Sequence, residues 1–274
     1  MVSTPMMGKP GLSVVIITKN EAARLRTCLA SVAFADEIIV IDSGSTDGTV
    51  ELAKQCGACV LVTSDWPGFG LQKQRGLDMA THDWVLTIDA DEWLDDQLAL
   101  AVTAVVKDVR DTTGQPSAYE VKRISAFCGQ WMHHGSWGKD FAVRLFKRGS
   151  ANFSSDLVHE RLIFNTKPVR LPGALLHNSI TSVHDGLDKL NRYTTGRAMD
   201  QRQSGKQGGL AKAITHGMWA FVRSYFIRMG ILDGRLGFVL AVLDAHNSYY
   251  RYLKLWLIDR DAAQHHLPPP RSGV

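Results

Sequence analysis

The sequence of 274 residues lacks an apolar run long enough to cross a bilayer, which takes ~18–20 consecutive apolar residues. The longest candidate, residues 236–243, stops at Asp244. The first eleven residues contain one basic residue and no continuous apolar stretch, so we expect no secretory signal there. These absences argue against a membrane-spanning protein, and an apolar content of 45% argues against a mainly disordered chain.

Cysteine is also scarce, with four residues at Cys28, Cys56, Cys59 and Cys128. The spacing of Cys56 and Cys59 occurs in redox and zinc sites, but the pair flanks a predicted helix end at Gly57 instead of a helix start. No second pair of ligands completes a zinc site. We interpret the four residues as packed free thiols in a reducing cytoplasm.

The charge is unevenly distributed along the chain. The formal net charge is +4, yet residues 1–188 carry a net −4, whereas residues 189–260 carry twelve basic and four acidic groups. A basic, aromatic-rich final third indicates an anionic partner, either a membrane surface or a nucleic acid.

Short apolar runs alternate with helical patterns over the first hundred residues. We predict strands at 12–17, 37–41, 58–62 and 84–88, separated by helices. Asn20 is expected to cap the first helix, and Thr46 or Asp47 the second. Such alternation predicts an α/β fold with a mainly parallel central sheet and right-handed crossovers.

The pattern loosens after Asp91. Apolar positions from Leu94 to Val109 predict a helix, and strands are expected at 118–124, 141–146, 158–164 and 169–176. Residues 181–259 are expected to be mainly helical. We therefore divide the chain into an α/β domain at 1–180, a helical basic and aromatic extension at 181–260, and a flexible tail at 261–274.

Polar residues follow three of the predicted parallel strands. They are Thr18-Lys-Asn-Glu21, Asp42-Ser-Gly-Ser-Thr-Asp47 and Asp89-Ala-Asp-Glu92. Because ligands of open parallel sheets bind at the carboxyl ends of the strands, these segments are expected to converge on one site.

Asp89 and Asp91 are two carboxylates two residues apart at the end of an apolar strand. Held close together they repel, and one would take up a proton unless a cation compensates. Mg²⁺ or Mn²⁺ fits this role, because both bind oxygen ligands together with substrate phosphates. The alternative is an acidic helix start favoured by the helix dipole, which Asp95 and Asp96 suit better.

The same segments resemble the nucleotide-binding half of family 2 glycosyltransferases. More narrowly, Thr18–Glu21, Asp42–Thr49, Gly70–Lys73 and Asp89–Glu92 resemble the lipopolysaccharide-core β-1,4-glucosyltransferase subgroup. The resemblance continues through Arg144-Leu-Phe146, Val158-His-Glu160 and Gly230–Gly234 and covers nearly the whole chain. It implies a GT-A nucleotide-sugar-binding fold and inverting, metal-dependent transfer of a sugar, with glucose as the suggested one, from a nucleotide diphospho-sugar.

The resemblance also implies roles for residues around the donor. Asp42 would contact the nucleoside, and Thr18 and Glu21 would line the same pocket; the alternative for Asp42 is a turn-forming residue, and both roles are compatible. Ser43 stands where many relatives have a second acidic residue. Lys73 would neutralise diphosphate charge, the alternative being a solvated helix lysine. Asp89 and Ala90 complete the predicted donor site.

The resemblance assigns two further roles. Asp140 would be the base that accepts the acceptor hydroxyl proton, with Glu160 as its rival. The alternative for Asp140 is a loop carboxylate paired with Lys139 or Arg144. His159 would complete the metal shell of Asp89 and Asp91, the alternative being a hydrogen-bonded structural histidine.

The basic third interleaves its charges with aromatic residues, which suits an anionic leaflet. Our hypothesis is peripheral attachment to the cytoplasmic face of the inner membrane, where a glycolipid or lipopolysaccharide-core acceptor would lie. The alternative is a helical extension that buries its aromatic residues and leaves a solvated basic face. Trp131, His133, His134 and Trp137 are candidates for the acceptor-sugar pocket, with core packing as the alternative for the tryptophans.

Two other classes of protein compete with the transferase. A nucleotidyltransferase would usually carry a glycine-rich, basic loop after the first strand, which Thr18–Glu21 does not provide. A nucleic-acid-binding protein could use the basic third, but the sequence has no zinc-finger or RNA-binding sheet signature. We therefore expect no nucleic-acid partner.

Overall fold

The computed structural model describes residues 9–108, 116–154, 162–164 and 166–263, without the side chains of 259 and 261–263. The chain forms two compact units, which are described separately. The first comprises Met1–Ala126 and Lys139–Ser179, and the second comprises Phe127–Gly138 and Ile180–Val274. Segment 127–138 thus belongs to the helical unit, whereas the sequence pattern placed the division at residue 180.

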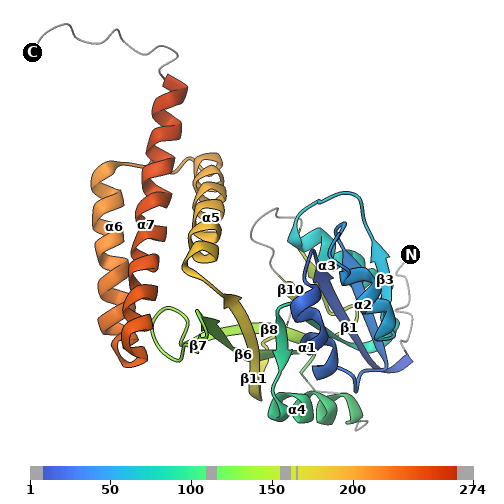
Figure 1. The fold of residues 1–274 in the computed structure, drawn as a ribbon. Helices are drawn as coiled ribbons and strands as arrows, with labels where there is room; N and C mark the ends of the chain where they lie inside the picture. Colours follow the sequence, from blue (N-terminus) through green and yellow to red (C-terminus); the bar gives the residue numbers. More distant parts are fainter. Residues whose placement is uncertain (1–8, 109–115, 155–161, 165, 264–274) are drawn as a thin grey trace, which may run out of the picture. The chain divides into compact units, whose positions relative to one another are not determined.

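Four parallel strands build the first half of the sheet, in the order β3 (Cys59–Val62), β2 (Glu37–Asp42), β1 (Lys9–Thr18) and β4 (His82–Asp89) (Figure 1). In the register, Thr18 pairs with Asp42, and Ile17 pairs with Asp89. The polar ends of three strands therefore lie next to one another, as the sequence predicts.

The sheet continues beyond β4 with β8 (Asp140–Lys147), β6 (Ala118–Phe127), β11 (Val169–Ile180) and β5 (Glu92–Leu94). Pairings β4–β8, β6–β8 and β5–β11 are antiparallel. β9 (Ala151–Phe153) and β10 (Leu162–Phe164) form a separate small sheet, and β7 (Gln130–Trp131) is short. The α/β class is confirmed, and the antiparallel strands begin where the strand–helix alternation ends in the sequence.

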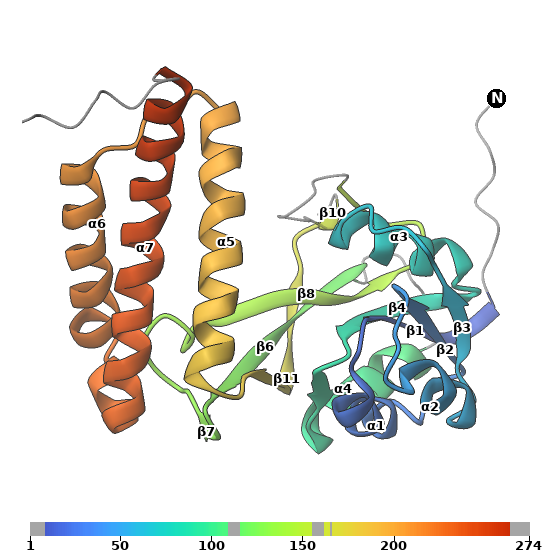
Figure 2. The same ribbon diagram turned by 45° about the horizontal axis from the view of Figure 1, so that its top comes forward.

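Both faces of the parallel strands are covered, which explains their continuous apolar sequence. Leu12, Val14 and Ile16 pack with side chains of α1 (Ala22–Ser31), α2 (Thr49–Gln55) and α4 (Asp96–Lys107). Val15 and Ile17 face the other way and pack with α3 (Phe69–Met79) and the small sheet (Figure 2).

Two local sequence predictions need correction. Leu94 belongs to β5, and α4 begins only at Asp96, because the Asp95 side chain caps the helix by accepting from the Leu98 N–H at 2.7 Å. Cys56 and Cys59 are free but exposed, not packed, since they flank the end of α2 and the start of β3, the terminal strand of the sheet.

The second unit is helical, as predicted for 181–259. It contains α5 (Val183–Gln203), α6 (Leu210–Val222), η1 (Arg223–Ile227, one π-helical turn), η2 (Gly230–Asp233) and α7 (Gly234–Ala263). Phe127, Met132, Ile180 and Leu240 form its buried core. In the part of the chain that the structure describes, no helix has the length and apolar character to span a membrane.

Asp233 ties segment 127–138 to the helices of this unit. Its carboxylate accepts from the His134 backbone N–H at 2.9 Å and lies 2.8 Å from the His134 ring nitrogen Nδ1. Its carbonyl accepts from the Gln130 side chain at 2.8 Å. The acceptor role predicted for His134 stays a prediction, and the structure gives this histidine a structural partner.

Candidate active site

The loops that follow β1 and β2 interlock through side chains. The Asn20 N–H donates to Ser45 Oγ at 2.7 Å, and Asn20 Oδ1 accepts from the Thr46 N–H at 2.9 Å. The Glu21 N–H donates to Thr49 Oγ1 at 2.9 Å. Asn20 makes its hydrogen bonds to the loop after β2 and does not cap α1, so the sequence prediction of an Asn20 cap is wrong.

Asp47 supplies the missing cap from across the interlock. One of its carboxylate oxygens accepts from the Ala22 N–H at the start of α1 at 3.1 Å, and the other accepts from the Thr49 N–H at 3.1 Å. The N-cap residue of α2 is Gly48, so neither Thr46 nor Asp47 caps this helix as the sequence predicts. The Asp47 side chain instead joins the first turns of both helices. These bonds fix the edge of the sheet before any ligand arrives.

Asp42 is fully buried at the end of β2. Its carboxylate accepts from the backbone N–H groups of Gly44 and Ser45 at 2.9 and 2.8 Å, and from the Ser45 hydroxyl. Gly44 has φ of 80°, a left-handed conformation that glycine adopts without strain. The turn-forming role of Asp42 is thus present in the structure, while its contact with a nucleoside stays a prediction.

Thr18 and Glu21 flank this turn. Thr18 is buried, and its hydroxyl has no hydrogen-bond partner among the described residues. Such an orphaned polar atom beside a strand end is the kind of group that a ligand can satisfy. The Glu21 carboxylate is paired with Arg24 at 3.0 Å and is partly exposed.

Helix α3 presents two buried polar side chains to the same edge. Gln72 donates to Ser43 Oγ at 2.9 Å and to Thr63 Oγ1 at 2.6 Å. Ser43, which stands where many relatives have an acidic residue, thus has a defined hydrogen-bond partner. The Lys73 side chain is 6% exposed, and its ammonium lies 3.0 Å from Asp89 Oδ1. A solvated helix lysine is therefore excluded.

Asp89 at the end of β4 faces two cations. Besides Lys73, the Arg144 guanidinium on β8 lies 3.3 Å from Asp89 Oδ2. Burial alone would raise the pKa of Asp89, but the charges of Lys73 and Arg144 hold it well below its usual range. The compensating cation that the sequence analysis expects for Asp89 is therefore supplied by side chains of the protein as well.

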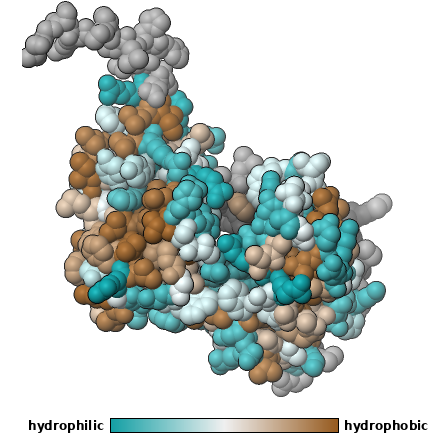
Figure 3. Space-filling model, in the orientation of Figure 1, coloured by the Kyte–Doolittle hydropathy of each residue, from teal (hydrophilic) through white to brown (hydrophobic). Residues whose placement is uncertain are grey.

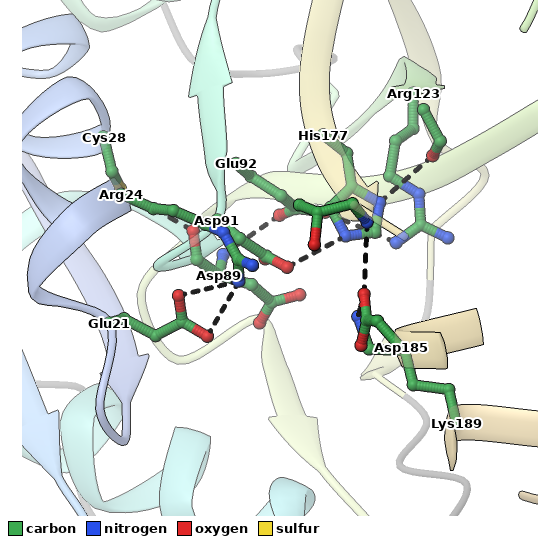
Figure 4. A network of polar contacts seen from close by, with 12 residues as sticks. Glu21, Arg24, Cys28, Asp89, Asp91, Glu92, Arg123, His177, Asp185 and Lys189 are labelled. Atoms are coloured by element: carbon green, nitrogen blue, oxygen red, sulfur yellow. Dashed lines mark hydrogen bonds and ion pairs between the residues drawn. The ribbon is translucent and has the colours of Figure 1, made fainter. Parts of the chain in front are cut away.

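Glu92 and Arg123 extend this charge network (Figure 4). The fully buried Glu92 accepts from Arg144 at 2.7 Å and from the Asp89 N–H at 2.9 Å, and it lies 3.3 Å from Arg123. Burial alone would lower the pKa of Arg123, but Glu92 and Asp140 raise it, so this guanidinium stays charged. The acids of segment 89–92 were visible in the sequence, whereas their arginine partners come from distant strands and were missed.

Asp140 is the first residue of β8, and it pairs with Arg123 at 2.7 Å. The described structure thus gives it neither of the partners proposed from sequence, Lys139 and Arg144. Its role as a base is not tested by this pairing. Glu160 and His159, the rival base and the predicted third metal ligand, lie outside the described residues.

Asp91 faces a histidine that sequence reasoning missed. His177 on β11 places Nε2 3.3 Å from Asp91 Oδ2, and its Nδ1 lies 3.0 Å from Ser125 Oγ. A carboxylate oxygen beside an imidazole whose other nitrogen is hydrogen-bonded is a donor set that suits a divalent ion such as Mn²⁺. The antiparallel pairing of β5 and β11 opposes His177 to Glu92 and brings the histidine close to Asp91.

The donor set fits a metal with few protein ligands. Among the described residues, no group of three or more His, Cys, Asp or Glu side chains is arranged to hold an ion. Mg²⁺ and Mn²⁺ sites that act on nucleotides often use one or two carboxylates and take their remaining ligands from phosphates and water. Asp91 and His177 match that pattern. Ala90 is buried in the core, so it can reach a donor only through its backbone.

Replacing Lys73 by Met tests the charge compensation of Asp89. We expect the free energy of unfolding at pH 7 to fall by about 1–3 kcal/mol, because Asp89 loses one of its two cations. Urea unfolding measures the change, and Lys54→Met on the exposed side of α2 is the matched control, expected to stay within about 0.5 kcal/mol. The difference should shrink below about pH 4, since Asp89 is then protonated in the unfolded chain and the pair loses its contribution. Equal losses in both variants would contradict the compensation.

Comparisons with known proteins identify the family of this chain. The family model Glycosyl transferase family 2 matches residues 13–147. An uncharacterized glycosyltransferase of Rickettsia prowazekii is 32% identical over 254 residues, which cover 89% of this chain and 86% of the relative. The lipopolysaccharide core biosynthesis glycosyltransferase LpsC of Rhizobium meliloti is 30% identical over 261 residues, covering 90% of this chain and 95% of the relative.

A solved structure is similar over a smaller part. Glucosyl-3-phosphoglycerate synthase from Mycobacterium tuberculosis, in complex with Mn²⁺ and uridine-diphosphate-glucose, is 26% identical and covers 42% of this chain and 43% of that chain. Its TM-score is 0.34, too low to place any residue of this site. The two curated relatives match most of their own length and of this chain, which therefore belongs to glycosyltransferase family 2.

Proposed function

We propose that this transferase moves a sugar, glucose in the first instance, from a nucleotide diphospho-sugar to a glycolipid or lipopolysaccharide-core acceptor with inversion of configuration. The observation that carries the proposal is the end of β4. There Asp91 faces His177, and Asp89 lies between Lys73 and Arg144, beside the interlocked loops after β1 and β2. Cations and metal-binding groups meet at the edge where a diphosphate would lie.

The residues divide between holding the donor and holding an ion. Thr18, Glu21 and Asp42 would line the nucleoside pocket, with the Thr18 hydroxyl available as a donor or acceptor. Lys73 and Arg144 would stabilise diphosphate charge, since both are already held at the strand end.

Asp91 and His177 would hold the Mg²⁺ or Mn²⁺ ion, with Asp89 beside them and His159 as the candidate that sequence supplied. When bound, the ion would neutralise charge on the departing nucleoside diphosphate.

The acceptor hydroxyl must lose a proton as it attacks the anomeric carbon. We keep Asp140 as the proposed base and Glu160 as its rival. The Arg123 guanidinium lies 2.7 Å from the Asp140 carboxylate and holds it in one orientation.

A donor-binding experiment tests the proposal. Thermal unfolding is followed with a panel of nucleotide diphospho-sugars in the presence of Mn²⁺, Mg²⁺ or a chelator, because a ligand that binds the folded state raises the melting temperature. We expect one donor to stabilise the protein with metal and to lose most of this effect with chelator. Asp91→Asn and His177→Gln should each weaken the metal-dependent donor affinity by about 10–100-fold.

His184→Gln is the control for these variants, since this α5 histidine is largely exposed. His159→Gln separates the two histidines: a loss in that variant with full affinity in His177→Gln would transfer the ligand role to His159. If no nucleotide sugar stabilises the wild-type protein under any metal condition, the proposed function is wrong.

The two base candidates are separated by their isosteric amides. Asp140→Asn is expected to lower kcat by about 10²–10⁴-fold while donor affinity is retained, because the proton acceptor is lost and the shape is kept. Glu160→Gln should keep most of its turnover. Steady-state kinetics with a competent acceptor measures both, and full turnover of Asp140→Asn would remove it as the base.

The acceptor side of the proposal draws on LpsC, which is named for lipopolysaccharide core biosynthesis. Such an acceptor is lipid-linked, so we propose that the helical unit attaches to an anionic membrane at the cytoplasmic face. Helix α6 supports this attachment, because it buries the small residues Ala213 and Gly217 and exposes large apolar residues to solvent. A side chain at Gly217 would meet the Tyr249 Cβ at 3.2 Å, so the close packing of α6 on α7 requires a small residue.

We call the exposed apolar surface of α6, η1 and η2 the apolar face. It comprises Leu210, Ile214, Met218, Trp219, Val222, Phe226, Ile227, Met229, Ile231 and Leu232. Figure 3 shows hydrophobic atoms gathered over the helical unit, where Figure 1 draws α6 and α7. Exposed Lys212, Arg223, Arg228 and Arg235 accompany this face, a combination that suits anionic headgroups.

Vesicle sedimentation tests the attachment. At low salt, the protein is expected to sediment with vesicles that contain phosphatidylglycerol and to stay in solution with neutral vesicles. The double variant Met218→Ser with Trp219→Ser should bind at least about tenfold more weakly, because it removes two of the most exposed apolar side chains. Leu100→Ser, at a 72% exposed position of α4, is the matched control. A wild-type protein that remains in the supernatant would refute the attachment.

A further inference from the structure

The helical unit contains a cavity that the proposed transfer reaction does not use. Its volume is about 170 Å³, measured as space open to the centre of a water molecule. A single water needs only about 10–15 Å³ by this measure, so the cavity admits a larger group. Its lining includes Arg197 of α5, Arg223 of η1, Arg228, and Asp244 and Arg251 of α7.

Four guanidinium groups converge here against one carboxylate. Among the described residues, none of these four arginines forms an ion pair, which would require a carboxylate oxygen within 4.0 Å of a guanidinium nitrogen. Asp244 accepts from Ser224 Oγ at 2.7 Å, and burial raises its pKa. Burial and the charge of Arg251 lower the pKa of Arg197, which indicates that the two cations repel one another.

The neighbouring Lys254 provides a contrast, because its ammonium donates all its hydrogen bonds to polar groups of the protein. Lys254 lies one turn beyond Arg251 on α7, and its ammonium donates to the Asn191 side chain at 2.7 Å and to Thr194 and Thr195 at 2.9 and 2.8 Å. In contrast, Arg251 Nε is buried with no hydrogen-bond partner among the described residues. Arg251 thus holds an unused donor inside the cavity, whereas the Lys254 ammonium is surrounded by acceptors.

The local backbone brings the arginines together. η1 is a π-helical turn in which the Arg228 N–H donates to the Arg223 carbonyl at 2.8 Å. π-helical turns are rare in proteins overall, and those that occur are often found at functional sites. The guanidinium of Arg228 also donates to the Ser136 carbonyl at 3.4 Å, so segment 127–138 helps to form the cavity.

We propose that this cavity binds a phosphate monoester group. Arginine presents paired N–H donors that match the oxygens of phosphate, and a doubly charged monoester answers the excess of three positive charges over Asp244. A phosphate would also relieve the repulsion between Arg197 and Arg251. The monoester could belong to a soluble sugar phosphate or to a lipid headgroup, and the two sources share this chemistry.

Calorimetric titration of the full-length protein with glycerol 3-phosphate tests the proposal, at constant ionic strength and without nucleotide sugar or metal. We expect binding that Arg251→Gln and Arg197→Gln each weaken at least tenfold. Arg192→Gln, an exposed α5 position outside the cavity, should bind like the wild type. In phosphate-free buffer, Arg251→Gln should melt no lower than the wild type, because one repelling charge is gone. Should Arg251→Gln fail to fold, Arg197→Gln provides the same comparison.

Vesicles distinguish the two sources of the group. Phosphatidic acid carries a phosphate monoester, whereas phosphatidylglycerol at equal charge carries a diester. If Arg197→Gln weakens binding to the first vesicle and not to the second, the ligand is a lipid headgroup. If it weakens binding of glycerol 3-phosphate and of neither vesicle, the ligand is a soluble phosphate. Wild-type protein that binds neither glycerol 3-phosphate nor phosphatidic acid more tightly than a matched chloride or phosphatidylglycerol control would overturn the proposal. So would unchanged binding in both arginine variants. Either failure leaves donor binding in the first unit untouched.

Discussion

The compensation of acidic charge at the end of β4 is the constraint on which the candidate active site depends. Asp89, Glu92 and Asp140 are held by Lys73, Arg144 and Arg123, which reach them from α3, β8 and β6. Glu92 is fully buried, and an uncompensated carboxylate there would destabilise the fold strongly. The network therefore couples folding of the sheet to the geometry of the site.

This network also changes the case for a metal ion. The repulsion between neighbouring aspartates does not by itself demand one, because protein cations already neutralise Asp89. What supports an ion instead is the pair formed by Asp91 and His177, which brings an oxygen and a nitrogen donor together beside the compensated cluster. Binding of a diphosphate would then add negative charge where Lys73 and Arg144 lie, so the same side chains serve stability and the proposed chemistry.

The loops after β1 and β2 show how residues of a predicted binding motif can also order the fold. The Asp42 carboxylate orders the turn, and the Asp47 carboxylate joins the first turns of α1 and α2. The Thr18 hydroxyl has no partner among the described residues. A pocket held by such bonds needs little reorganisation on binding, which lowers the entropy cost of association. The helical unit differs in this respect. It leaves large apolar side chains exposed, and its Arg251 Nε donor has no hydrogen-bond partner among the described residues.

The sequence by itself determined the α/β class, the positions of the first four strands along the chain and the convergence of Thr18, Asp42 and Asp89. Period, strand-end polarity and parallel pairing are local or follow from a general rule, so they can be derived without coordinates. Only the tertiary structure revealed the arginine partners of the acids, the position of His177 and the fact that segment 127–138 belongs to the helical unit. Each depends on antiparallel register or on contacts between residues far apart in the chain, and a shift of one residue in register would turn His177 to the other face of the sheet. Residue types therefore fix which chemistry is available, whereas long-range pairing decides which side chains meet.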